Sequence, residues 1–100
     1  MSKRVAVVIL NYNTRDFLSG FLPSVCATDY DNLEIVVADN ASADGSAELV
    51  ISEFPQVRLI RFDQNYGFTG GYNRALKLVE ADYYVLLNSD VEVTPGWLIV

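Results

Sequence analysis

Residues 83–92 read Tyr-Tyr-Val-Leu-Leu-Asn-Ser-Asp-Val-Glu, a strand-favouring apolar run that passes directly into polar residues. Such a run is typical of a strand that is buried on both faces of a parallel sheet. Open α/β sheets bind their ligands at the carboxyl ends of the strands, so we expect Asp90 at the mouth of a cleft. Its carboxylate could hold a divalent cation there, or it could simply end the strand and begin a turn. The stretch alone leaves both interpretations open.

The rest of the chain alternates between strand and helix patterns. Apolar runs predict strands at 5–10, 33–38, 57–62 and 83–87, and helical spacing predicts helices at 15–27, 46–54 and 69–79. The inner helix faces are predicted to carry Phe17, Leu18, Phe21, Leu22 and Val25 in the first helix, and Ala47, Val50, Ile51 and Phe54 in the second. This series predicts one α/β domain with a mostly parallel, Rossmann-like sheet, strand order 3-2-1-4 and helices on both faces.

Composition excludes several classes of function. A net charge of -6 argues against a nucleic-acid surface, which needs a basic stripe. The absence of histidine excludes a His-based metal site, a Ser-His-Asp triad and a Cys-His pair. The single cysteine, Cys26, excludes an internal disulfide and is interpreted as a small buried hydrophobe. Carboxylates and amides therefore remain as the main polar groups available for chemistry.

The last residues look like the opening of a helix, with Thr94 as its N-cap and Pro95 in its first turn. The pattern stops within this element, which predicts that the chain is a truncated piece of a longer protein. We expect such truncation to expose apolar surface on the fourth strand and at Trp97, and to favour self-association.

Two loops are expected to reach the same crevice as Asp90. Asp39 ends the second strand and could accept hydrogen bonds from a nucleobase imide or a ribose hydroxyl, or it could cap the following turn. Asn11-Tyr12-Asn13 follows the first strand, and the Tyr12 ring could pack on a base. Anchoring of that loop against the core is the simpler interpretation of Tyr12. Asp44-Gly45-Ser46 is predicted to form a turn that caps the second helix.

Glycines cluster where the third helix begins. Gly67, Gly70 and Gly71 would each cost about 1 kcal/mol relative to alanine within a helix. The cluster therefore indicates a close backbone approach, either to the sheet or to a ligand. It matches neither a dinucleotide-binding fingerprint nor a P-loop. Arg74 follows it and could reach a pyrophosphate or a base, or could be an exposed helix charge.

Four segments, taken together and in order, resemble glycosyltransferase family 2. They are Val7–Asn13, Ile35–Ser46, Asn65–Arg74 and Leu86–Asp90. Members of this family are inverting enzymes with the GT-A fold. The third segment, Asn-x-Gly-Phe-x-Gly-Gly-x-Asn-Arg, is most similar to the branch that contains rhamnosyltransferases and galactofuranosyltransferases of bacterial cell-surface glycan assembly.

The resemblance implies a role for each candidate residue. It implies nucleotide binding by Asn11, Tyr12, Asn13, Asp39, Arg74, Asn88 and Ser89. It implies that Asp90 coordinates Mn²⁺ or Mg²⁺ bridging the diphosphate. Asn88 stands where the family's Asp-x-Asp motif has its first acid. This departure leaves the metal on one carboxylate together with phosphate oxygens.

The resemblance also implies the reaction. The full-length protein would transfer a sugar from a UDP- or dTDP-linked donor to a glycan or lipid-linked acceptor, in the cytoplasm or at the inner face of the membrane. In this family the catalytic base and the acceptor half lie beyond the position of Val100. We therefore expect residues 1–100 to bind the donor and to be inactive alone.

Two other classes stay open. A receiver-like doubly wound domain needs an acidic pair after the first strand, where Asn11-Tyr12-Asn13 stands instead. The other alternative is a non-catalytic nucleotide-binding α/β module.

Overall fold

The computed structural model describes residues 3–88 and 96–97 and contains the predicted elements in the predicted order. The third strand is shorter than predicted, and the third helix begins two residues earlier, at Gly67. The elements are β1 (Val5–Asn11), α1 (Arg15–Cys26), β2 (Leu33–Asp39), α2 (Ser46–Glu53), β3 (Arg58–Arg61), α3 (Gly67–Leu78) and β4 (Tyr83–Asn88).

The four strands form one parallel sheet in the order β3-β2-β1-β4, which confirms the predicted order 3-2-1-4. The central strand, β1, pairs with β2 on one side and β4 on the other. The register places Asn11 opposite Asp39, and Leu10 opposite Asn88. The carboxyl ends of these three strands therefore finish level with one another, at the point where the strand order reverses.

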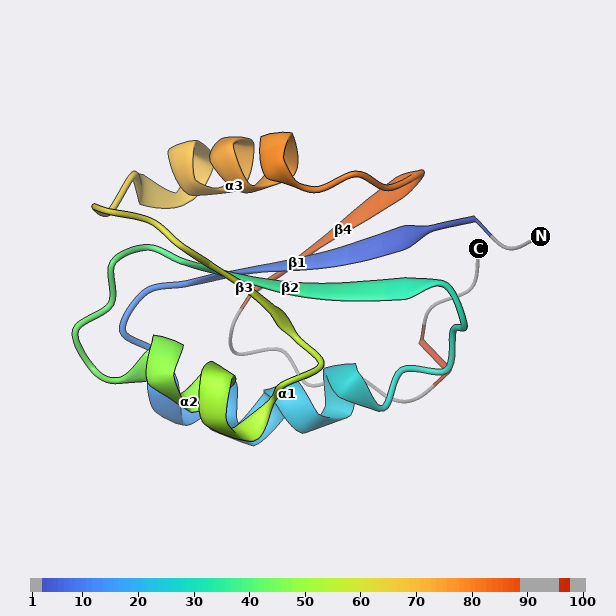
Figure 1. Ribbon diagram of the computed structural model, residues 1–100, viewed down its shortest axis with the longest axis horizontal. Helices are drawn as coiled ribbons and strands as arrows, with labels where there is room; N and C mark the ends of the chain where they lie inside the picture. The colour runs from blue at the N-terminus through green and yellow to red at the C-terminus, as the bar shows by residue number, and fades with distance from the viewer. Residues whose placement is uncertain (1–2, 89–95, 98–100) are drawn as a thin grey trace.

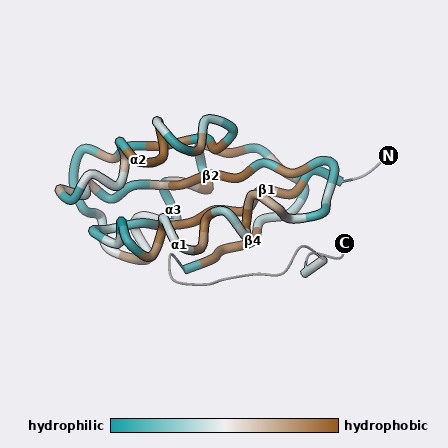
Figure 2. Tube along the Cα trace, turned by 90° about the horizontal axis from the view of Figure 1, so that it is seen from below, coloured by the Kyte–Doolittle hydropathy of each residue, from teal (hydrophilic) through white to brown (hydrophobic). Residues whose placement is uncertain are grey.

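Helices cover both faces of the sheet, with α1 and α2 on one face and α3 on the other (Figure 1). The labelled strands β1, β2 and β4 are drawn largely in the hydrophobic colour in Figure 2, and Figure 1 shows the sheet between the two helix layers. On the first face the β1 residues Val7 and Ile9 pack in one cluster with α1. On the opposite face Ala6 and Val8 pack in a second cluster with α3. A strand buried on both sides must be apolar at every position, which explains the continuous apolar run of β1.

Two predicted inner-face residues are exposed, so the prediction was wrong for them. Phe17 is 62% exposed because it lies in the first turn of α1, next to the carboxyl edge of the sheet. Ile51 is 59% exposed because the buried face of α2 includes Ser46, Leu49 and Val50. These three lie at helical spacing on one side, which turns Ile51 toward solvent.

The prediction that β4 is buried on both faces was also wrong. The strand lies at the edge of the described sheet, where it pairs with β1 alone, and Tyr83, Tyr84 and Leu86 are exposed. Its apolar surface is therefore open, which agrees with the expectation of exposed apolar surface on the fourth strand. The prediction for Trp97 differs from the structure, because this side chain is partly buried. Its indole Nε1–H donates to Thr28 Oγ1 at 2.7 Å, and the ring packs against the cluster beneath α1.

None of the helices in the described part of the chain combines the length and the apolar character that crossing a lipid bilayer requires.

Candidate functional site

A polar network joins the loops that follow β1 and β2. Its centre is Asp39, which is only 2% exposed. One carboxylate oxygen of Asp39 accepts a hydrogen bond from Asn11 Nδ2 (2.8 Å), and the other accepts one from the Ser42 N–H (3.0 Å). The Ser42 hydroxyl in turn accepts from the Asn13 N–H (2.9 Å). The parallel register causes this meeting, because it sets Asn11 directly beside Asp39.

The same two loops contain unusual backbone conformations. Asn13 and Ala41 have positive φ angles of 51° and 62°, a region that costs roughly 1–2 kcal/mol for a residue with a Cβ. Hydrogen bonds across the loops hold these conformations. Asn13 Oδ1 accepts from the Ala43 N–H (2.8 Å), and the Asn40 N–H donates to the Asn11 carbonyl (2.8 Å). The two loops therefore support each other as one structure at the carboxyl edge.

A cavity of about 430 Å³ lies beside this network. Three aromatic side chains on its lining, Tyr12, Phe17 and Phe68, are 48%, 62% and 66% exposed. The full lining is Leu10, Tyr12, Thr14, Phe17, Asn40, Asn65, Gly67, Phe68 and Asn88. Within the described part of the chain, this lining includes no charged side chain. Aromatic faces with amide groups between them suit a flat, uncharged ring that can stack and form hydrogen bonds.

The start of α3 forms one wall of the cavity and is held by Asn40. Asn40 Oδ1 accepts from the Tyr66 N–H (3.0 Å), and Asn40 Nδ2 donates to the Gly67 carbonyl (3.0 Å). A Cβ placed on Gly71 would lie 2.6 Å from Leu10 Cδ1. The close approach indicated by the glycine cluster is therefore made to the sheet. Asn40 was not predicted as a functional residue. Its place directly after the buried end of β2 is a feature of the sequence that could have indicated it.

Arg74 lies away from this cavity. Its guanidinium stacks over the Tyr66 ring, 3.7 Å from the ring centroid. Both residues line a second cavity of about 400 Å³ together with Arg61, Phe62, Asp63, Lys77 and Leu78. A hydrogen bond from the Tyr66 hydroxyl to Asp63 (2.5 Å) raises the pKa of Tyr66. The structure thus brings Asn11, Tyr12, Asn13, Asp39 and Asn88 to one edge, but it places Arg74 over a neighbouring groove.

Two candidate residues, Ser89 and Asp90, lie outside the described residues. The neighbouring Asn88 is exposed at the end of β4 and lines the first cavity. Across residues 3–88 and 96–97, no three acidic or cysteine side chains gather as a metal-binding group. The metal role of Asp90 therefore stays a prediction. Amide and carboxylate oxygens are hard ligands that fit Mg²⁺ and Mn²⁺.

Asp44 has the structural role that its position in the sequence indicates. Its carboxylate accepts hydrogen bonds from the Arg15 N–H (3.0 Å) at the start of α1 and from the Ser46 N–H (3.1 Å) at the start of α2. Burial acts to raise the pKa of Asp44, but hydrogen bonds from Ser46 and Arg15 outweigh it and hold this pKa below its usual value. Asp44 therefore caps two helices at once.

Cys26, the last residue of α1, is partly buried and lines neither of these two cavities. Burial raises the pKa of its thiol, which agrees with the interpretation of Cys26 as a small hydrophobe rather than a nucleophile.

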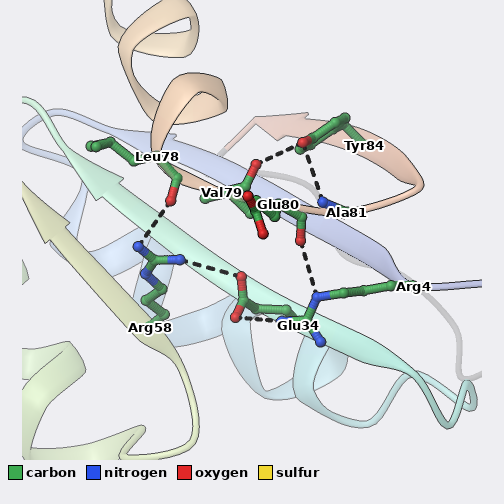
Figure 3. A network of polar contacts seen from close by, with 8 residues as sticks. All are labelled: Arg4, Glu34, Arg58, Leu78, Val79, Glu80, Ala81 and Tyr84. Atoms are coloured by element: carbon green, nitrogen blue, oxygen red, sulfur yellow. Dashed lines mark hydrogen bonds and ion pairs between the residues drawn. The ribbon is translucent and has the colours of Figure 1, made fainter.

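A separate polar network ties the opposite, amino-terminal edge of the sheet together (Figure 3). Glu34 pairs with Arg4 at 2.8 Å and with Arg58 at 3.6 Å. Arg58 also donates to the carbonyl of Leu78, the last residue of α3, and Arg4 donates to the carbonyl of Glu80. Cations at the carboxyl end of a helix are stabilising, so we assign this network to the fold rather than to ligand binding.

Comparison with known proteins agrees with the fold. The family profile described as "Glycosyl transferase family 2" matches residues 6–99. The chain is 32% identical to the Escherichia coli UDP-Glc:alpha-D-GlcNAc-diphosphoundecaprenol beta-1,3-glucosyltransferase WfaP, over 86% of this chain and 35% of that protein. It is 34% identical to the succinoglycan biosynthesis protein ExoO of Rhizobium meliloti, over 94% of this chain and 27% of that protein.

A Mycobacterium tuberculosis N-acetylglucosaminyl-diphospho-decaprenol L-rhamnosyltransferase is 28% identical, over 96% of this chain and 35% of that protein. The chain thus spans about a third of the length of these curated relatives.

Solved structures show the same architecture. The mannosyltransferase PcManGT from Pyrobaculum calidifontis, in complex with GDP-Man and Mn²⁺, superposes with a TM-score of 0.83 at 26% identity, over 92% of this chain and 29% of that one. Staphylococcus aureus TarS 1-349 in complex with UDP-GlcNAc gives a TM-score of 0.83 at 23% identity, over 92% of this chain and 28% of that one. TarS therefore supports the fold alone. The predicted Rossmann-like GT-A fold is confirmed, and the chain belongs to glycosyl transferase family 2.

Proposed function

We propose that this chain binds the nucleoside-diphosphate-sugar donor of a glycosyltransferase. One observation carries the proposal: the network around Asp39 borders an aromatic, uncharged cavity at the switch point of a parallel sheet. A carboxylate offers about four acceptor sites, and two bonds to the Asp39 carboxylate come from Asn11 and Ser42. Asp39 is 2% exposed and does not itself line the cavity, so a pyrimidine base would have to reach into the loop network for its imide N–H to donate to a remaining lone pair, while Tyr12 packs against its ring.

The relatives support this class of donor. The printed name of the Escherichia coli relative includes UDP-Glc, and the Pyrobaculum structure contains GDP-Man with Mn²⁺. By analogy, we assign Asn11, Asn13 and Asn88 to the nucleotide, together with Ser89. Arg74 would contact the nucleotide only from the groove that it lines with Tyr66.

Mn²⁺ or Mg²⁺, held by Asp90 and donor oxygens, would supply positive charge opposite the leaving diphosphate. The chain's own residues would orient the donor. The aromatic walls exclude water from the bound ring, and the Asp39 network fixes the position of the base. This orientation is compatible with the inverting displacement at the anomeric carbon that the family resemblance implies.

We propose that the acceptor site and the catalytic base belong to a part of the relatives' length that this chain does not span. Two relatives are named for diphospho-polyprenol-linked sugars, so a lipid-linked glycan in bacterial polysaccharide assembly is the proposed acceptor class. We therefore expect no sugar transfer by these 100 residues alone. Transfer catalysed by this chain without any added protein would contradict this division of roles.

Calorimetric titration with UDP, dTDP and GDP, each with and without Mn²⁺, tests donor binding. We expect one nucleotide to bind and Mn²⁺ to tighten it. Asp39→Asn keeps the shape of the side chain but removes its charge, and should weaken binding by about tenfold or more, as expected for a lost hydrogen bond to a charged group.

Asp31→Ala is the matched control, because Asp31 is an exposed acid in the turn before β2, at the opposite edge of the sheet. It should leave affinity unchanged. If the wild-type chain binds none of the three nucleotides in either condition, donor binding by this chain is wrong.

A further inference from the structure

Phe68 is the most exposed of the large hydrophobic side chains on the cavity lining, and its position depends on how α3 begins. It is the second residue of α3 and makes an edge-to-face contact with Tyr72, with ring centroids 5.0 Å apart. Tyr72 is buried against the sheet, and its hydroxyl donates to the Leu87 carbonyl of β4 (2.8 Å). Phe68 is 66% exposed and so can contact a ligand, while its contact with Tyr72 anchors the ring.

Asn40 holds the two residues that precede Phe68. This side chain is 2% exposed, and it both accepts from the Tyr66 N–H and donates to the Gly67 carbonyl. Its own backbone N–H is bonded to the Asn11 carbonyl, which fixes it to the end of β1. A buried amide whose donor and acceptor are both used fixes two neighbouring peptide groups relative to the sheet.

Two further contacts complete the attachment. Asn65 Oδ1 accepts from the Gly67 N–H (2.8 Å) and supports the positive φ of 75° at that glycine. The bare backbone of Gly71 lets α3 approach so closely that an added Cβ would lie 3.0 Å from Asn40 Nδ2. Asn40 thus lies between the end of the sheet and the glycine-rich first turns of the helix.

We propose that Asn40 is a positioning residue, which sets the Phe68 wall at the distance from Tyr12 that a flat, uncharged ring of the donor requires. The inference rests on the proposed function for the identity of the ligand. The claim that Asn40 fixes the start of α3 concerns this chain alone. The cavity lining supports an uncharged ring, since its described residues are aromatic, aliphatic, hydroxyl and amide groups. The nucleobase is the part of a nucleoside diphosphate sugar that has this chemistry.

Amide hydrogen exchange measured by NMR tests whether Asn40 fixes the start of α3. In Asn40→Ala, protection of the Tyr66 N–H should fall by about tenfold or more, whereas core amides of β1 such as that of Val8 should keep theirs. Asn40→Asp retains an acceptor for the Tyr66 N–H but no donor for the Gly67 carbonyl, so an intermediate loss is expected. Asn73→Ala, an exposed asparagine on the same helix, is the control. Unchanged Tyr66 protection in Asn40→Ala would overturn the inference.

A double-mutant cycle tests whether Asn40 acts through Phe68. The probes are UDP, dTDP and GDP with Mn²⁺, titrated into the 100-residue chain. Asn40→Ala and Phe68→Ala should each weaken binding of the preferred nucleotide by about tenfold, the effect of losing one stacking wall. In the Phe68→Ala background, Asn40→Ala should change the affinity by less than about threefold.

Fully additive effects would show that Asn40 does not act through this wall and would overturn the positioning role. A general loss of stability would lower affinity in both backgrounds and would not produce the expected cycle. If the wild-type chain binds no nucleotide, the proposed function fails, while the exchange measurement still decides whether Asn40 holds the start of α3.

Discussion

At Gly71, α3 approaches the sheet so closely that an added Cβ would lie 2.6 Å from Leu10 Cδ1. A side chain there would meet Leu10 from β1 and the buried amide of Asn40. Overpacking of a well-filled interior typically costs about 1–3 kcal/mol, because neighbours must leave their preferred rotamers. Glycine at this position therefore serves packing and, through Asn40, the shape of the cavity.

We predict that Gly71→Ala lowers the free energy of unfolding by up to about 2 kcal/mol, because the overpacking cost of about 1–3 kcal/mol is offset by about 1 kcal/mol of helix propensity at this position within α3. Gly20→Ala is the matched control, because Gly20 lies within α1 with open space around it. That change should raise stability by up to about 1 kcal/mol through helix propensity. Urea unfolding followed by circular dichroism measures both. An increase in stability for Gly71→Ala would contradict the close approach.

At the scale of elements, the two helices on one face of the sheet share a single capping carboxylate. Asp44 accepts backbone hydrogen bonds at the first residue of α1 and at the first residue of α2. Both helix starts are thereby fixed close to the loops that follow β1 and β2. The polar network around Asp39 depends on these same loops, so the cap also steadies the candidate site.

We predict that Asp44→Ala lowers the free energy of unfolding by about 1 kcal/mol at neutral pH, the usual cost of a lost cap. The folded-state pKa of Asp44 lies below its ordinary value of 3.8. Its contribution is therefore fully present above that value and is lost as the pH falls through the folded-state pKa. The difference between wild type and variant should shrink accordingly in urea unfolding at acidic pH.

Asp31→Ala, which removes an exposed carboxylate without removing a cap, controls for the change in net charge. A stability difference between wild type and Asp44→Ala that stays constant down to strongly acidic pH would show that the carboxylate does not act as a cap.

At the scale of the whole molecule, β4 is an apolar edge of the described sheet. Tyr83, Tyr84 and Leu86 are exposed, and β4 pairs on one side with β1. An edge strand that is flat and uncharged offers free backbone groups to another chain. The register sets Leu86 beside Val8, on the sheet face that α3 covers elsewhere.

We predict that the 100-residue chain self-associates through β4 as its concentration rises. Leu86→Lys should shift the sedimentation-velocity profile toward monomer, because a charge on an edge strand opposes strand pairing. Ile51→Lys is the control, since Ile51 is also an exposed aliphatic side chain but lies on α2. Equal effects of both substitutions would point to general solubility rather than to the strand edge.

The order of the elements and the parallel sheet with order 3-2-1-4 could be predicted from the sequence, and the structure confirms both. Strand and helix periodicity is a local property of the chain, and the handedness of crossovers restricts the topology. The resemblance of four segments to one family was confirmed by the match over residues 6–99. The roles of Ser89 and Asp90 stay predictions, because these residues lie outside the described part of the structure.

The contacts between polar groups could not be predicted from the sequence and are seen only in the folded chain. Asp39 bonds Asn11, Asn40 holds Tyr66 and Gly67, and Arg74 stacks on Tyr66 above a separate groove. Most of these contacts join residues 26–28 positions apart, and the Arg74 contact depends on how the first turns of α3 are placed. Hydrophobic periodicity predicts which face of an element is buried. It does not predict which side chain a polar group will contact in the folded chain. That choice depends on strand register and on the depth at which α3 packs, which Gly71 sets by having no side chain.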